Sequence, residues 1–152
     1  MKAKDLMIGN LVNIYTFPND NPSENDLFPA KITSILTALP SEQFYESVEC
    51  VFEAKDKEGG LGCASRPADT CLPIRITPEI LVKNGFEQDK RDKNYYKWNW
   101  YVMEDNASYD TETRQLRIFK CGDLTYWYPV SYVHELQNAL RLCEVDKEIN
   151  LF

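Results

Sequence analysis

Segment 77–86 constrains the fold most strongly, because it carries the signals for both ends of a short helix. The Thr77 hydroxyl suits an N-cap, Pro78 suits the first helical position, and the carboxylate of Glu79 is favourable near the helix N-terminus. Gly85 is typical of a helix that stops in the left-handed conformation, after which Phe86 can fold back onto the last turn. The sequence therefore predicts about two turns of helix in the middle of the chain.

Before this helix, the chain has the composition of a small β-structure. Three segments show the alternation or the β-branched residues of strands, namely 11–17, 31–36 and 48–52. Segment 18–29 is rich in proline, asparagine and acids and predicts a solvated loop, whereas segment 61–73 has no regular pattern. We therefore expect a small N-terminal antiparallel sheet, for which an SH3-like barrel is one arrangement.

After the helix, aromatic strands and a second helix are expected. Segments 94–104, 115–120 and 124–128 have strand composition and are separated by turn residues. Ser131 can cap a final helix, in which an apolar stripe recurs at helical spacing, at Val133, Leu136, Leu140 and Cys143. The second half therefore predicts a helix, an antiparallel meander and a helix.

Together the two halves predict an α+β fold. The chain has 152 residues, a length typical of one domain. We expect a single compact domain over 1–152, with an N-terminal β part at about 1–74 and a helix–meander–helix part at about 75–152.

Charge and hydropathy disfavour several classes of function. The net charge of −7 disfavours binding to nucleic acid or to an anionic membrane, since both depend on Lys and Arg. The sequence contains no run of 18 apolar residues and no apolar core of a signal peptide. We therefore expect a cytoplasmic protein without a membrane partner.

The five cysteines favour reduced thiols over disulfides or a metal site. Their number is odd, no two form a CxxC pair, and the chain has one histidine; the cysteines are Cys50, Cys63, Cys71, Cys121 and Cys143. We expect most of them to be buried, with Cys63 and Cys71 the most exposed. Neither a metal nor another cofactor is predicted.

No catalytic motif is complete. His134 and Glu135 resemble the start of HExxH, but Asn138 stands where the second histidine would be. The simpler expectation is that His134 lies in the first turn of the final helix and bonds a carbonyl. The sequence also lacks the glycine motifs that bind phosphates or dinucleotides, and it lacks a nucleophile elbow. No catalytic residue is therefore predicted, and an enzyme of unrecognised type is the least favoured alternative.

The best candidate contact surface lies in segment 90–101, where basic and aromatic residues alternate. On a strand, Tyr96, Trp98, Trp100 and Val102 would face the core. The opposite face would carry Tyr95, Lys97, Asn99 and Tyr101, and we select Tyr95, Lys97 and Tyr101 as the candidate surface. Aromatic rings beside cations can also bind single-stranded nucleic acid, which keeps that partner as an alternative.

Three motifs resemble those of a family of short uncharacterised proteins from Bacteroides-type gut bacteria and from their phages and mobile elements. They are LMIGNLV at 6–12, ITPEILVKNGFE at 76–87 and YVHELQN at 132–138. Met7 and the segment 139–142 depart from the family pattern, and the loops at 18–29 and 55–73 look like insertions. The resemblance implies a compact cytoplasmic protein of mobile-element origin and transfers no catalytic residue.

Two classes of function follow from these features. The favoured one is a non-enzymatic accessory factor that binds another protein, because paired chemistry is missing and aromatic residues are abundant. The alternative is a nucleic-acid-associated factor that uses strand 90–101 despite the net charge.

Overall fold

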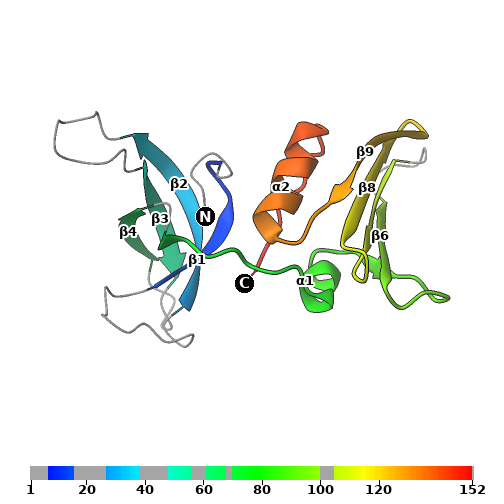
Figure 1. Cartoon of the computed structure of the whole chain (residues 1–152), viewed down its shortest axis with the longest axis horizontal. Helices are drawn as coiled ribbons and strands as arrows, with labels where there is room; N and C mark the ends of the chain where they lie inside the picture. The colour runs from blue at the N-terminus through cyan, green and yellow to red at the C-terminus, as the bar shows by residue number, and fades with distance from the viewer. Residues whose placement is uncertain are drawn as a thin grey trace. The chain divides into compact units, whose positions relative to one another are not determined.

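The computed structural model describes residues 7–15, 27–37, 48–55, 61–67, 70–99 and 105–151 (Figure 1). The chain divides into two compact units, Met1–Ile74 and Arg75–Phe152. The first is built from strands and the second from strands and two helices, so the α+β class is confirmed. That the two units form one compact domain stays a prediction.

The first unit is an antiparallel sheet. Its strands are β1 (Leu11–Tyr15), β2 (Leu27–Thr37), β3 (Val48–Lys55) and β4 (Leu61–Pro67), in the order β1-β2-β3-β4. Its described core comprises apolar side chains of β1 and β2 together with Cys71, namely Leu11, Val12, Ile14, Ala30, Ile32 and Cys71. Because β1 and β4 are the two edges of this order, the described strands form an open sheet. The SH3-like barrel is therefore not the arrangement found; Leu72 adds only a single bridge to Asn13 of β1.

Two predictions in this unit are wrong. Strand β2 begins at Leu27, inside the segment predicted as a loop, and β4 occupies part of the segment predicted as irregular. In both cases pairing decides the structure. Pro29 lies opposite Asn13, and β4 pairs with β3 along its whole length. Glycine and proline lower intrinsic strand propensity, but pairing with a neighbouring strand overrides that preference.

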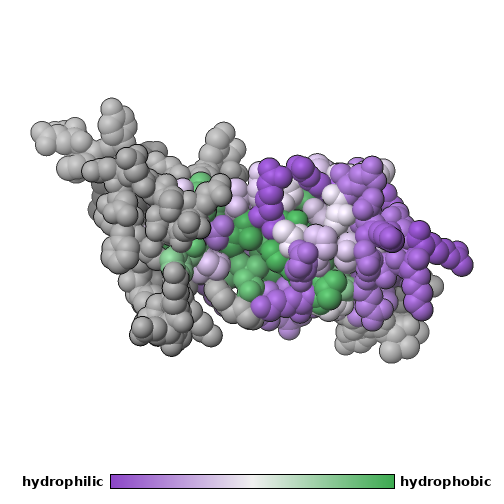
Figure 2. All heavy atoms as spheres, turned by 90° about the horizontal axis from the view of Figure 1, so that it is seen from below, coloured by the Kyte–Doolittle hydropathy of each residue, from purple (hydrophilic) through white to green (hydrophobic). Residues whose placement is uncertain are grey.

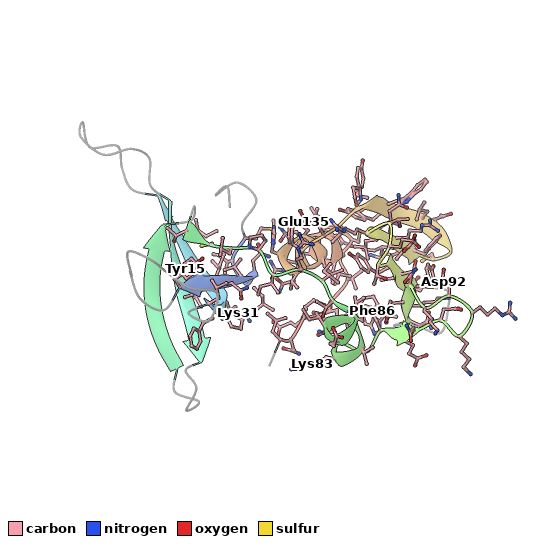
Figure 3. The ribbon with its side chains drawn as sticks, turned by 60° about the horizontal axis from the view of Figure 1, so that its bottom comes forward. Tyr15, Lys31, Lys83, Phe86, Asp92 and Glu135 are labelled. Atoms are coloured by element: carbon pink, nitrogen blue, oxygen red, sulfur yellow. The ribbon has the colours of Figure 1, made fainter. Side chains whose placement is uncertain are left out.

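Helix α1 (Pro78–Lys83) of the second unit is confirmed with both of its ends. The Thr77 hydroxyl accepts a hydrogen bond from the backbone N–H of Ile80 at 3.4 Å. Gly85 has a φ of 78°, and the N–H groups of Gly85 and Phe86 donate to the Val82 and Leu81 carbonyls at 2.9 and 3.0 Å. These are the two hydrogen bonds of a Schellman motif. Phe86, shown beside α1 in Figure 3, is buried as predicted.

The sheet of the second unit is a five-stranded antiparallel meander in sequential order. It comprises β5 (Glu87–Gln88), β6 (Tyr95–Asn99), β7 (Asn106–Asp110), β8 (Gln115–Lys120) and β9 (Asp123–Pro129). The meander was predicted, but β7 was not, because its sequence NASYD consists largely of turn residues. It is nevertheless paired on both sides, with β6 and with β8.

Helix α2 (Val133–Leu142) carries the predicted apolar stripe, of which Val133, Leu136 and Leu140 are buried. The N-cap is Tyr132 rather than Ser131. The Glu135 carboxylate accepts hydrogen bonds from the backbone N–H groups of Ser131 and Tyr132, at 2.7 and 3.1 Å. An acid at this position also complements the helix dipole, so Glu135 supplies the N3 half of a capping box at the start of α2.

Both helices lie on the same side of the five-stranded sheet (Figure 1). We call that side of the sheet the core face. Its buried residues pair across neighbouring strands: Tyr96 pairs with Tyr109, Tyr109 with Leu116, and Ala107 with Ile118. The opposite side of the sheet is the outer face, and no other described element of this unit covers it.

Candidate interaction surface

The outer face is defined by the strand register. Residues paired across neighbouring strands share a face, so the row Glu87, Lys97, Ser108, Arg117 and Trp127 crosses the whole sheet. A second row contains Tyr95, Asp110, Gln115 and Pro129. The outer face therefore combines an exposed indole, two cations, two acids and a half-buried phenol.

Trp127 is the largest exposed side chain of this face, with 52% of its surface accessible. The guanidinium carbon of Arg117 lies 5.5 Å from the centre of the Trp127 ring, within the range of a cation–π contact. The indole N–H donates to the Gln115 side-chain oxygen at 2.8 Å. Trp127 is thus exposed and also held in one orientation, which lowers the entropy lost when such a ring binds a partner.

A β-bulge places a second apolar residue on this face. The register shifts between Ile118 and Phe119, so that Phe119 pairs with Leu124 while Ile118 pairs with Tyr126. Without the shift, Leu124 would share the core face with Tyr126, because side chains alternate along a strand. With it, Leu124 joins Phe119 and Trp127 on the outer face, and Leu124 is exposed.

The charges of the outer face are mixed. Glu87 lies directly opposite Lys97. Burial alone would raise the pKa of Asp110, but hydrogen bonds from Thr113 and Glu112 and the charge of Arg117 hold it below its usual value. Of the described residues of this face, none extends the two cations into a continuous positive stripe. Figure 2 shows mainly hydrophilic residues over the right-hand part of the molecule.

The predicted contact residues are only partly recovered. Lys97 is exposed on the outer face, Tyr95 is half-buried there, and Tyr101 lies outside the described residues. Among the residues predicted to face the core, Tyr96 is buried and Trp98 is half-buried, while Trp100 and Val102 are not described. Sequence reasoning missed Arg117 and Trp127, which join Lys97 only through the register of four strands.

His134 occupies the predicted first turn of α2 and is buried. Its ring stacks on that of Tyr132, with centres 5.9 Å apart and planes inclined by 15°. In the part of the chain that the structure describes, no cluster of three or more histidines, cysteines and acids could hold a metal ion. The segments described also include no helix long and apolar enough to cross a membrane.

The expected order of cysteine exposure is wrong for Cys71. It is fully buried, although it lies in the segment that was predicted to be irregular, whereas Cys121 is exposed and Cys143 is half-buried. Cys121 has a φ of 51° in the turn before β9, and its N–H donates to the Asp105 carboxylate at 2.5 Å. The side chains of Cys50 and Cys63 lie outside the described residues.

Several residues of the three sequence motifs have structural roles, although Ile8 and Val82 of these motifs are exposed. Gly9 has a φ of 86° and its N–H donates to the Ile32 carbonyl at 2.6 Å, while Asn10 is buried beside it. Thr77 caps the start of helix α1, Gly85 follows its end, and Glu135 caps the start of helix α2. These positions therefore secure the fold, and none of them belongs to the outer face.

Comparison of the chain with protein-family models, curated proteins and solved structures gives no match.

Proposed function

We propose that this chain is a non-enzymatic accessory factor that binds another protein through the outer face of its second sheet. The observation that carries the proposal is Trp127, exposed yet held by Arg117 and Gln115. Tryptophan and arginine dominate the binding energy of protein interfaces, especially where they are already oriented. Leu124 and Phe119 extend the apolar centre, and Lys97 and Asp110 lie at its polar margin.

The origin of the factor is also proposed. The likeness of the three motifs to proteins of Bacteroides-type bacteria, phages and mobile elements supports a phage or mobile-element accessory role in the cytoplasm. Gly9, Gly85 and Glu135 of the motifs secure the fold, so these residues support a likeness in architecture. We place the contact with the partner outside the motifs, at Trp127.

Nucleic-acid binding is the second candidate, since Lys97, Arg117 and Trp127 share one face. Single-strand binding combines stacked rings with a groove of positive charge. Here Glu87 lies opposite Lys97, and Asp110 interacts with Arg117. This mixture of charges favours a protein partner.

A matched pair of variants tests the proposal. Trp127→Ala removes the exposed indole from the outer face, whereas Tyr128→Ala removes a neighbouring ring that belongs to the core-face side and is 63% exposed. Affinity capture from native cells should retain the same partner with the parent and with Tyr128→Ala, and lose it with Trp127→Ala. Equal capture by all three proteins would contradict the proposal.

The same proteins tested against a single-stranded oligonucleotide at low salt decide the alternative. Binding by the parent that weakens steeply with salt and disappears in Trp127→Ala would favour the nucleic-acid function. Thermal melts should show that both variants remain folded, since surface changes usually alter the free energy of unfolding by no more than about 0.5 kcal/mol.

A further inference from the structure

A small pocket in the second unit brings together two arginines that are distant in the sequence. It has a volume of about 210 Å³ and is lined by Arg75, Ile76, Pro78, Tyr109, Thr111, Arg114 and Ser131. The lining therefore contains two permanent cations and no carboxylate. The carboxylates of Asp110 and Glu135 are near enough to act on the charge state of Tyr109, but neither residue lines the pocket.

Backbone hydrogen bonds fix the walls of this pocket. The Ile76 N–H donates to the Ser131 carbonyl at 3.1 Å, and the Val130 N–H donates to the Arg114 carbonyl at 2.7 Å. The Tyr109 hydroxyl donates to the Val130 carbonyl at 2.7 Å. The segment before α1, the β7–β8 turn and the segment before α2 are thereby joined, so the pocket belongs to the fold of this unit.

The two guanidinium groups are available to a ligand. No hydrogen bond or ion pair joins either side chain to the part of the chain that the structure describes. Glu135, labelled in Figure 3, follows Ser131 closely in sequence but is not part of the lining. Its carboxylate accepts from the backbone N–H groups of Ser131 and Tyr132.

We propose that this pocket binds a phosphate group. Guanidinium forks match the oxygens of a phosphate, and two fixed positive charges balance a dianion better than a singly charged carboxylate. The half-buried Ser131 can add a hydroxyl donor. Because pockets for drug-sized ligands have volumes of about 300–1,000 Å³, this smaller one suits inorganic phosphate or the phosphate end of a small monoester.

Titration with inorganic phosphate tests this site directly. At pH 7.5 and constant ionic strength, calorimetry or backbone amide shifts should show saturable binding by the parent, with shifts centred on Ser131. Arg75→Gln and Arg114→Gln should each weaken binding at least about tenfold. Arg91→Gln, which removes an exposed arginine from the β5–β6 turn, should leave it unchanged.

One further variant and one further ligand test whether the site recognises a phosphate dianion. Arg114→Lys keeps the charge but loses the fork, so it should bind phosphate more weakly than the parent and more strongly than Arg114→Gln. Acetate should bind far more weakly than phosphate, and equal binding would overturn the assignment to a dianion. Lack of saturation well above millimolar phosphate, or an equal loss in Arg91→Gln, would overturn the site itself.

Discussion

The side-chain amide of Asn84 exchanges two hydrogen bonds with the backbone of Asn150. Its Nδ2 donates to the Asn150 carbonyl at 2.9 Å, and its Oδ1 accepts from the Asn150 N–H at 2.7 Å. The same Nδ2 also donates to the Ile80 carbonyl at 2.8 Å. Asn84 therefore ties the end of α1 to the segment after α2, where Val145 and Ile149 are buried.

Asn84→Ala should lower the free energy of unfolding by about 1–3 kcal/mol, because it removes three part-buried hydrogen bonds, two with the backbone of Asn150 and one to the Ile80 carbonyl. Chemical denaturation of the parent and the variant measures this difference. Asn99→Ala, at an exposed position of β6, is the control and should stay within about 0.5 kcal/mol of the parent. Equal effects of the two changes would show that the link to Asn150 contributes nothing.

Gly85→Val should destabilise the protein by about 1 kcal/mol or more, since a β-branched residue is strained at a φ of 78°. Space is not the cause, because an added Cβ would meet its nearest neighbour, Trp98 Cδ1, at an ordinary 3.9 Å. Gly85→Asn should be milder, since asparagine tolerates this conformation better. Coinciding thermal melts of the parent and the valine variant would contradict the assigned helix stop.

Both ends of helix α1 were predictable because their signals are local. Thr77, Pro78 and Gly85 act within one or two turns of the chain, so their residue types suffice. Strands β4 and β7 were missed for the opposite reason. Gly62 and Pro67 in β4, and Asn106 and Asp110 in β7, disfavour a strand locally and are held by their neighbours.

The candidate site depended even more on long-range geometry. Lys97 was selected because it alternates with aromatic residues on one strand, but Trp127 joins it only across the register of β6 to β9. Leu124 lies on the outer face because of a bulge that the local sequence does not predict. Pocket residues Arg75 and Arg114 likewise meet through tertiary contacts alone.

Tyr109 makes stability depend on pH in the alkaline range. Burial is the main cause that raises its pKa from 10.0 to about 12. The unfolded chain therefore loses this proton first, so the contribution of Tyr109 is complete below pH 10 and is lost as the pH rises towards 12. In Tyr109→Phe, the decrease in stability between pH 9 and pH 11 should be smaller than in the parent.

The control for Tyr109→Phe is the stability at neutral pH. There the variant should be less stable by about 1 kcal/mol, because it loses the hydrogen bond to the Val130 carbonyl. The difference in tyrosinate absorbance between the two proteins, followed against pH, should show one phenol that ionises at a higher pH than an ordinary tyrosine. An unchanged pH profile of stability would contradict the burial of this hydroxyl in the fold.

Arg117 and Trp127 should be coupled energetically. A double-mutant cycle with Arg117→Ala and Trp127→Ala should give a coupling free energy of about 0.5–1 kcal/mol, typical of an exposed cation–π pair. The matched cycle of Arg117→Ala with Tyr128→Ala pairs residues on opposite faces and should give almost none. If both cycles are additive, Arg117 does not hold Trp127, and the part of its preorganisation assigned to Arg117 is refuted.

Photocrosslinking in native cells tests the proposed binding face most directly. A photoreactive phenylalanine analogue is placed at Leu124 in one protein and at Tyr128 in another, since both side chains are exposed but belong to opposite faces and Trp127 is kept in both proteins. We expect a discrete adduct from position 124 that protease digests and nuclease leaves intact, and much less adduct from position 128. A nuclease-sensitive adduct at 124, adducts only at 128, or no adduct at either position would contradict protein binding by the outer face.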